Sequence, residues 1–87
     1  KADQPADTSV TLAGRCCESG DLIQENAPIR TCTPGDVLAV LATGAYNYSM
    51  ASNYNRLPRP PIVMLAKDRA YEAVRRETLE DLIALDL

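Results

Sequence analysis

The stretch Ser9-Val10-Thr11-Leu12-Ala13 alternates polar and apolar side chains, and Gly14 follows it directly. Strict alternation is typical of a β-strand with one face in the core and the other in solvent, and glycine weakens a strand. We therefore predict a half-buried strand over Ser9–Ala13 that ends at Gly14. The segment Lys1–Asp7 is polar, contains a proline and has no periodicity, so residues 1–8 are predicted to form a connector.

A second strand and a turn are predicted after this one. Asp21–Ile29 is a weaker strand candidate, and Pro28 within it indicates an edge position because proline donates no ladder hydrogen bond. Pro34-Gly35-Asp36 is predicted to be a turn, since proline presets φ and glycine tolerates a positive φ. The continuous apolar run Val37–Ala42 has the length of a strand that is buried on both faces.

The second half of the chain begins with an irregular segment. Gly44–Asn55 mixes small, amide and tyrosine residues without a clear period, which predicts a loop with one helical turn. Ile62–Ala66 and Ala70–Arg76 are predicted strands, joined by a turn at Lys67-Asp68. Between them and the loop, Arg59 is expected to brace the loop by pairing with an acidic side chain.

The tail gives the clearest helix signal. Thr78 is a good N-cap, acidic residues follow it near the positive end of the helix dipole, and the apolar stripe consists of Leu79, Leu82 and Ile83. The chain is thus predicted to be mainly β, with one domain over residues 9–87 and one short terminal helix. Several short strands at close spacing are typical of a small β-barrel or a β-sandwich, and the pattern does not choose between them.

Composition limits the possible functions. The chain has 87 residues, of which 46% are hydrophobic but none is Phe or Trp, so the core is thin and a further domain or partner is expected. A net charge of −3 argues against binding to nucleic acid. The longest apolar run is far too short for a membrane span, so we expect a soluble protein.

The cysteines and the absence of histidine narrow the chemistry further. The chain has three cysteines, two of them adjacent, so a disulfide framework is not expected and a reducing, cytoplasmic compartment fits best. With no histidine and no Cys-x-x-Cys pair, no zinc site is predicted. The usual general base of serine and cysteine hydrolases is missing as well.

Three clusters of residues carry a specific resemblance. Cys17-Glu18-Ser19-Gly20-Asp21, then Gly44-Ala45-Tyr46, then Ser52-Asn53-Tyr54-Asn55 closely resemble, in order and spacing, the C-terminal part of the diaminopimelate decarboxylases. The resemblance runs from about Ala13 to Leu82. It implies a β-barrel domain that packs on a (β/α)₈ barrel, and a native enzyme several times longer than this chain. That family uses pyridoxal phosphate to convert meso-diaminopimelate to L-lysine and carbon dioxide.

The resemblance also implies roles for individual residues. Cys17 corresponds to the thiol that donates a proton to the substrate's α-carbon, and a thiol is mostly protonated at neutral pH. Glu18 corresponds to the carboxylate that binds the distal ammonium group of the substrate. Tyr46 corresponds to the phenol that binds the cofactor phosphate and lies near the substrate. The other two cysteines, Cys16 and Cys32, are expected to be packing residues.

Other family features have no counterpart here. Neither Lys1 nor Lys67 has the context of the cofactor-binding lysine, so that lysine is expected to lie outside the chain, and the fragment alone is expected to be inactive. The resemblance implies a homodimer in which Cys17 and Glu18 reach the partner's active site. Two alternatives remain open. A related ornithine or arginine decarboxylase typically has Asp after the cysteine, so Glu18 argues against it, and a non-enzymatic β-module would bind a protein through the tyrosine-rich loop.

Overall fold

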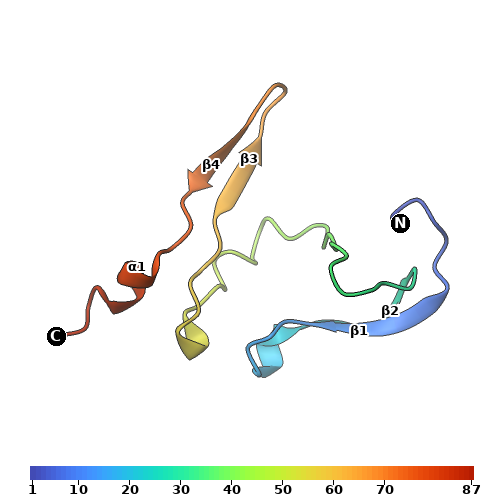
Figure 1. Cartoon of the computed structure of the whole chain (residues 1–87), viewed down its shortest axis with the longest axis horizontal. Coiled ribbons are helices and arrows are strands. Elements are labelled where there is room, and N and C mark those ends of the chain that lie inside the picture. Colours follow the sequence, from blue (N-terminus) through green and yellow to red (C-terminus); the bar gives the residue numbers. More distant parts are fainter. The chain divides into compact units, whose positions relative to one another are not determined.

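The computed structural model describes all residues, 1–87, and divides into two compact units, residues 1–39 and residues 40–87, which are described separately (Figure 1). Each unit contains one two-stranded antiparallel sheet. The prediction of a mainly β chain with one short terminal helix is confirmed. The expected barrel is not formed by this chain, because its strands make only two separate hairpins. Its one α-helix has five residues, too few to cross a lipid bilayer.

The first unit is built on the hairpin of β1 (Thr8–Ala13) and β2 (Leu22–Ile29). Both predicted strands are confirmed, the first almost to the residue. The register shifts between Val10 and Leu12, where β2 has an extra residue, and Asn26 there adopts a φ of 54°. Asparagine tolerates this left-handed conformation better than most residues, so it suits a β-bulge.

The end of the first unit confirms the predicted turn. Gly35 has a φ of 98°, which a type II turn needs after proline, and the amide of Asp36 donates to the carbonyl of Thr33 at 3.0 Å. The Asp36 carboxylate accepts from the amide of Thr33 at 2.9 Å and pairs with the ammonium of Lys1 at 2.7 Å. The Asp36 carboxylate therefore ties the start of the chain to this turn.

The predicted buried strand over Val37–Ala42 is wrong for this chain. The segment has no strand assignment, and Val37 and Leu41 are 93% and 83% exposed. An apolar run becomes a buried strand only when neighbouring strands pair with it and layers cover both faces. Neither is provided within the chain, in which Ala27 is the only buried apolar residue.

The second unit begins with the predicted irregular loop. The amides of Asn47 and Met50 donate to the carbonyls of Thr43 and Tyr46 at 3.2 and 3.1 Å, which makes the expected helical turn. A 3₁₀ turn, η2 (Tyr54–Arg56), follows. The amide group of Asn53 donates to the carbonyl of Leu57 at 3.0 Å and so satisfies a loop backbone group.

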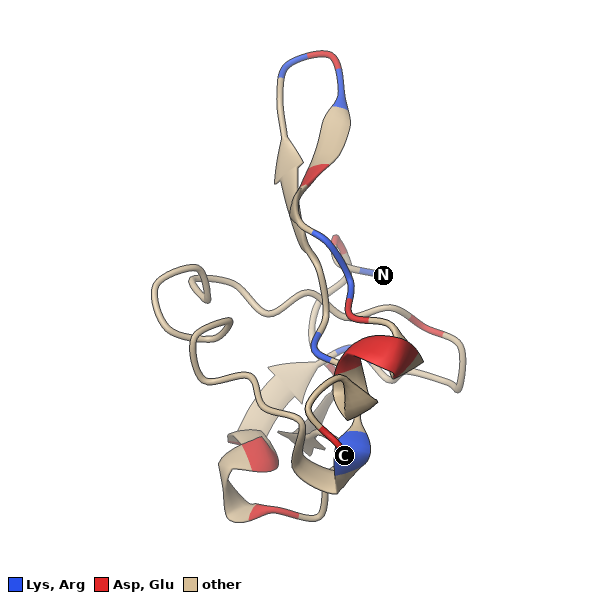
Figure 2. Ribbon diagram, turned by 90° about the vertical axis from the view of Figure 1, so that its left-hand side faces the viewer, with Lys and Arg blue, Asp and Glu red and all other residues tan.

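The rest of the second unit is the hairpin of β3 (Ile62–Leu65) and β4 (Ala70–Val74), then α1 (Leu79–Ile83). Charged residues occupy the hairpin tip (Figure 2), where the guanidinium of Arg69 lies 4.9 Å from the Tyr71 ring centroid. The predicted strand to Arg76 ends early, at Val74. Arg75 turns instead toward the helix, where it pairs with the Asp81 carboxylate at 2.6 Å.

The helix starts as predicted. Thr78 and Asp81 form a capping box: the Asp81 amide donates to Oγ1 of Thr78 at 3.2 Å, and the Thr78 amide donates to the Asp81 carboxylate at 2.8 Å. The guanidinium of Arg75 and the backbone amide of Thr78 both hold the pKa of the Asp81 carboxyl well below its usual range. The apolar stripe is less buried than expected, since Leu79 and Ile83 are 70% and 58% exposed.

Glu77 is the centre of a polar network in the second unit. Its carboxylate accepts from the amide of Arg59 at 2.6 Å, from the guanidinium of Arg59 at 3.0 Å and from the side chain of Asn53 at 2.7 Å. The predicted pairing of Arg59 with an acid is thereby confirmed. The guanidinium of Arg59, then its amide, then Asn53 lower the pKa of Glu77 to about 2.

The Glu77 network predicts a pH-dependent contribution to stability. A carboxylate whose pKa is lowered on folding stabilises the folded state above its unfolded pKa, and the contribution is lost as pH falls toward its folded pKa. The Glu77→Gln variant should therefore unfold at a lower temperature than wild type at pH 7, and this difference should shrink between pH 4.5 and pH 2, the ordinary and lowered pKa values of Glu77. Thermal unfolding followed by circular dichroism measures it, with Glu72→Gln on β4 as control. An equal difference at both ends of that range would contradict the prediction.

Candidate functional site

The predicted catalytic cysteine lies in the turn that joins β1 to β2, here called the cysteine turn and defined as residues Gly14–Asp21. The turn is closed by two backbone hydrogen bonds, from the amide of Gly14 to the carbonyl of Asp21 and from the amide of Asp21 to the carbonyl of Glu18, both 2.9 Å. It ends in the 3₁₀ helix η1 (Ser19–Asp21). This turn brings Cys17 and Glu18 to one edge of the hairpin.

Cys17 is exposed and has an unusual backbone conformation. Its φ is 55°, in the left-handed region that residues other than Gly, Asn and Asp adopt rarely. Consecutive side chains of a regular strand point to opposite faces, so a regular strand would separate Cys17 from Glu18. The sharp turn at Cys17 removes that separation. Residues in such conformations persist only where their surroundings hold them, and they gather at functional sites.

The carboxylate of Glu18 is held by its own turn. Oε2 accepts from the amide of Gly20 at 2.8 Å, and Oε1 accepts from the hydroxyl of Ser19 at 3.3 Å. A Cβ atom on Gly20 would lie 2.6 Å from Oε2, so glycine provides the space for this arrangement. An ionised carboxylate has about four acceptor positions. Glu18 is therefore oriented in advance and retains capacity to accept from a cationic group.

A shallow pocket opens beside these residues. Its volume is about 240 Å³, below the usual range for sites that enclose a whole drug-sized ligand. It is therefore suited to one end of a small molecule. The lining residues are Ala13, Gly14, Cys17, Glu18, Ser19, Asp21 and Leu22.

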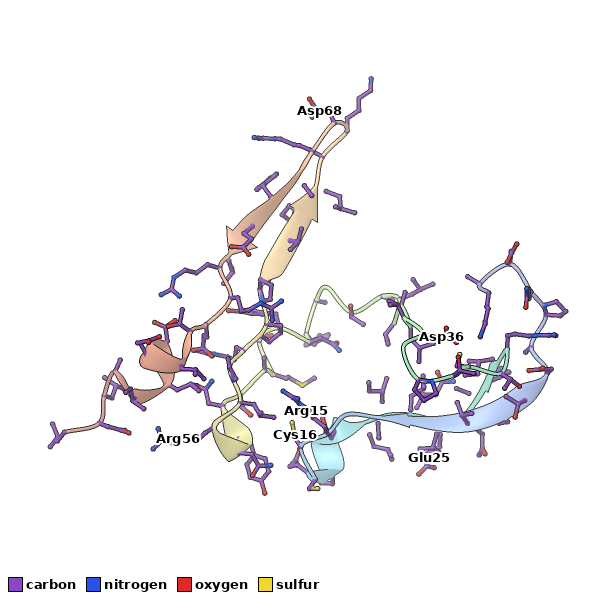
Figure 3. The ribbon with its side chains drawn as sticks, in the orientation of Figure 1. Arg15, Cys16, Glu25, Asp36, Arg56 and Asp68 are labelled. Atoms are coloured by element: carbon purple, nitrogen blue, oxygen red, sulfur yellow. The ribbon has the colours of Figure 1, made fainter.

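Of the two cysteines expected to be packing residues, Cys16 is partly buried, whereas Cys32 is exposed, so the expectation is wrong for Cys32. Cys16 is half-buried, and its side chain lies beside that of Arg15 in the cysteine turn (Figure 3). Burial raises the pKa of the Cys16 thiol, and the nearby Asp21 carboxylate raises it further. Cys32 is exposed, and its thiol donates to the carbonyl of Arg30 at 3.2 Å. A raised pKa makes Cys16 less reactive than an ordinary thiol, because the thiolate is the nucleophile.

Tyr46 belongs to the second unit. It lies in the helical turn described above, with its side chain 72% exposed, and its backbone carbonyl accepts from the hydroxyl of Ser49 at 2.9 Å. Tyr54, in the same loop, is 52% exposed. The hydroxyl of Tyr46 is thus presented on a structured turn where it can donate to an anionic group.

Asp21 is the last residue of the Cys17–Asp21 motif, and the sequence alone does not reveal its contacts. In the structure its carboxylate accepts a hydrogen bond from the amide of Cys16 and lies over Gly14. The sequence feature that points to this contact is the presence of Gly14 and Asp21 at the two ends of the cysteine turn. The chain contains no cluster of three or more acidic or sulfur side chains arranged to hold a metal ion.

Comparison with known proteins identifies the family. The model of the pyridoxal-dependent decarboxylase C-terminal sheet domain matches residues 1–44, just over half of the chain. The chain belongs to this family. The matched residues include the whole cysteine turn, with Cys17 and Glu18, whereas Tyr46 follows the matched region.

Individual decarboxylases of known name are similar over nearly the whole chain. The chain is 51% identical over 81 residues to the diaminopimelate decarboxylase of Bacillus subtilis (strain 168), covering 93% of the chain and 18% of that protein. It is 47% identical over 85 residues to that of Staphylococcus aureus (strain COL), covering 97% and 20%. The chain therefore spans about a fifth of the length of these relatives.

Solved structures agree. The diaminopimelate decarboxylase of M. jannaschii matches with a TM-score of 0.87 and 39% identity, over 100% of this chain and 20% of that one. A second structure of that enzyme, in complex with L-lysine, matches equally well. Both structures are thus similar to this chain over its whole length.

Proposed function

We propose that this chain is the C-terminal part of a diaminopimelate decarboxylase, which converts meso-diaminopimelate to L-lysine and carbon dioxide. The observation that carries the proposal is identity of about half the residues, over nearly the whole chain, to enzymes of that name. The cysteine turn supports it, because a thiol and an oriented carboxylate line one small pocket there.

Each candidate residue has a role in this reaction. The C–C bond to the α-carboxylate breaks, carbon dioxide leaves, and the electron pair remains at the α-carbon. Pyridoxal phosphate, when bound, withdraws this charge. Cys17 then gives its Sγ proton to the α-carbon and regains one from solvent. Glu18 accepts from the substrate's distal ammonium, a charge-assisted hydrogen bond that fixes which amino acid binds.

The residues of this chain fit a limited part of the cofactor site. Tyr46 presents an exposed hydroxyl that suits one phosphate oxygen. The two lysines fit less well, since Lys1 is paired with Asp36 and Lys67 lies at the turn between β3 and β4. We therefore place the cofactor-binding lysine outside this chain, in the domain that the longer relatives possess.

The same proposal covers the architecture of the whole enzyme. Residues 9–87 form the C-terminal domain after a connector at residues 1–8, and their strands complete a β-barrel together with further strands of the polypeptide. The exposed apolar run around Val37 and Leu41 supports this, because it needs cover. The enzyme is a homodimer that shares active sites, and three cysteines, two of them adjacent, fit a reducing, cytoplasmic compartment.

The test is an assay of the full-length enzyme with added pyridoxal phosphate. Release of carbon dioxide is expected from meso-diaminopimelate and not from ornithine or arginine, because Glu18 stands where decarboxylases of ornithine and arginine typically have Asp. Activity on ornithine or arginine instead would move the assignment to that related enzyme. No release from any of the three would overturn the enzyme proposal and leave a protein-binding β-module.

A further inference from the structure

The carboxylate of Asp21 closes the cysteine turn from inside. Its Oδ2 accepts a hydrogen bond from the amide of Cys16, the residue before the candidate proton donor. The backbone of Asp21 also takes part, since its carbonyl accepts from Gly14 and its amide donates to Glu18, both at 2.9 Å. Asp21 thus contacts Gly14 at the start of the turn, Cys16 just before Cys17, and Glu18 just after it.

Gly14 provides the space that this arrangement needs. A Cβ atom at Gly14 would lie 2.6 Å from Cγ of Asp21 and 2.7 Å from its Oδ2, closer than non-bonded atoms approach. Any larger residue at Gly14 must therefore push the carboxylate of Asp21 away from the amide of Cys16. Gly14 and Asp21 act as a pair, although six residues separate them in the chain.

Cys17 needs such support because of its own backbone. At a φ of 55° it occupies a region in which a Cβ atom crowds the following carbonyl. With the amide of Cys16 released, the chain is free to return to an extended conformation, in which Cys17 and Glu18 point to opposite faces. The Sγ atom would then leave the position from which it delivers its proton.

We propose that Asp21 is a positioning residue for Cys17, and that Gly14 is required to seat its carboxylate. The inference rests on the proposed function for its catalytic consequence, but not for its structural one. Asp21 itself touches neither the α-carbon nor the distal ammonium. It acts through the backbone of Cys16, which directs the thiol of Cys17 toward the pocket. That pocket is lined by Cys17, Glu18 and Asp21 among others.

The first test is a double-mutant cycle of Asp21 and Cys17, measured by steady-state kinetics in the full-length enzyme. Asp21→Ala should lower kcat by roughly 100-fold with little change in KM, since small misplacement of a catalytic group costs about that much. In a Cys17→Ala background the same substitution should cost almost nothing more, because the group that it positions is gone. An equal loss in both backgrounds would mean that Asp21 acts elsewhere, and would overturn the proposal.

Two further variants keep the test decisive if Asp21→Ala does not fold. Asp21→Asn retains an oxygen that accepts from the amide of Cys16, so it should restore most of the activity. Gly14→Ala should reproduce the loss, and adding it to Asp21→Asn should abolish the rescue. Glu25→Ala, on the exposed face of β2 (Figure 3), is the control and should match wild type. Full activity in Gly14→Ala would contradict the steric argument.

Amide hydrogen exchange tests the structural part without any activity. Peptides that cover the cysteine turn should exchange roughly 10-fold faster or more in Asp21→Ala, because the amide of Cys16 loses its acceptor. Unchanged exchange would overturn the proposal. A wild-type enzyme that decarboxylates none of the three amino acids would overturn the proposed function instead, and the exchange result then decides separately whether Asp21 holds the turn.

Discussion

Replacing Cys17 with alanine in the full-length enzyme is expected to lower kcat for lysine formation by roughly 100- to 10,000-fold, the usual contribution of a positioned general acid. KM should change little, because the thiol acts after the substrate is bound. In a single turnover, release of carbon dioxide should fall less than formation of lysine, since in the proposed mechanism bond cleavage precedes the protonation assigned to Cys17. Both products are measured in the same quenched samples.

Cys16→Ala is the matched control for this prediction. It removes the neighbouring thiol, which is half-buried and has a raised pKa, but keeps the backbone amide that Asp21 binds. Near-normal kinetics are expected. Equal losses in the two variants would indicate a packing defect in the cysteine turn and not the loss of a proton donor.

The second large effect is expected from Glu18→Gln. The substitution keeps the size of the side chain but removes the negative charge, so kcat/KM for meso-diaminopimelate should fall by roughly 100-fold, as expected when a hydrogen bond between charged groups is lost. The loss should depend on the substrate's distal end. An analogue with the same chain but no distal ammonium should be processed about equally by wild type and variant.

Comparison of the two substrates gives the control within the experiment. A fall of the same size for both would mean that Glu18 shapes the turn through Gly20 and Ser19, whose donors it accepts, and does not bind the ammonium. Glu25→Gln provides an independent control, because Glu25 is exposed on β2 and lies outside the pocket lining. Its kinetics should match those of wild type.

Local features were predictable because short-range rules govern them. The strand over Ser9–Ala13 follows from alternation, the turn at Pro34-Gly35 from the φ preferences of its residues, and the helix start from Thr78 as N-cap. The pairing of Arg59 was predicted in kind, though its partner Glu77, eighteen residues later, was not. The candidate site residues came from the resemblance, since no propensity rule selects Cys17.

The prediction that failed and the contacts that were not predicted depend on groups distant in the chain or outside it. The run Val37–Ala42 has the composition of a buried strand, but composition cannot supply the strands and layers that bury it. The role of Asp21 appears only when the hairpin folds back and brings its carboxylate over Gly14. The low pKa of Glu77 likewise requires Arg59 and Asn53 to converge on one carboxylate.

The sequence by itself therefore determined the mainly β character of the chain, its turns, its helix cap and the family to which its motifs point, because each depends on residues near one another in the chain. Only the tertiary structure decided that Cys17 adopts a left-handed backbone and that Glu18 is oriented by Gly20. It also decided that the Asp21 carboxylate meets the Cys16 amide. The hydrogen bond between Cys16 and Asp21 depends on the pairing of β1 with β2, since that pairing fixes the two ends of the turn that contains both residues.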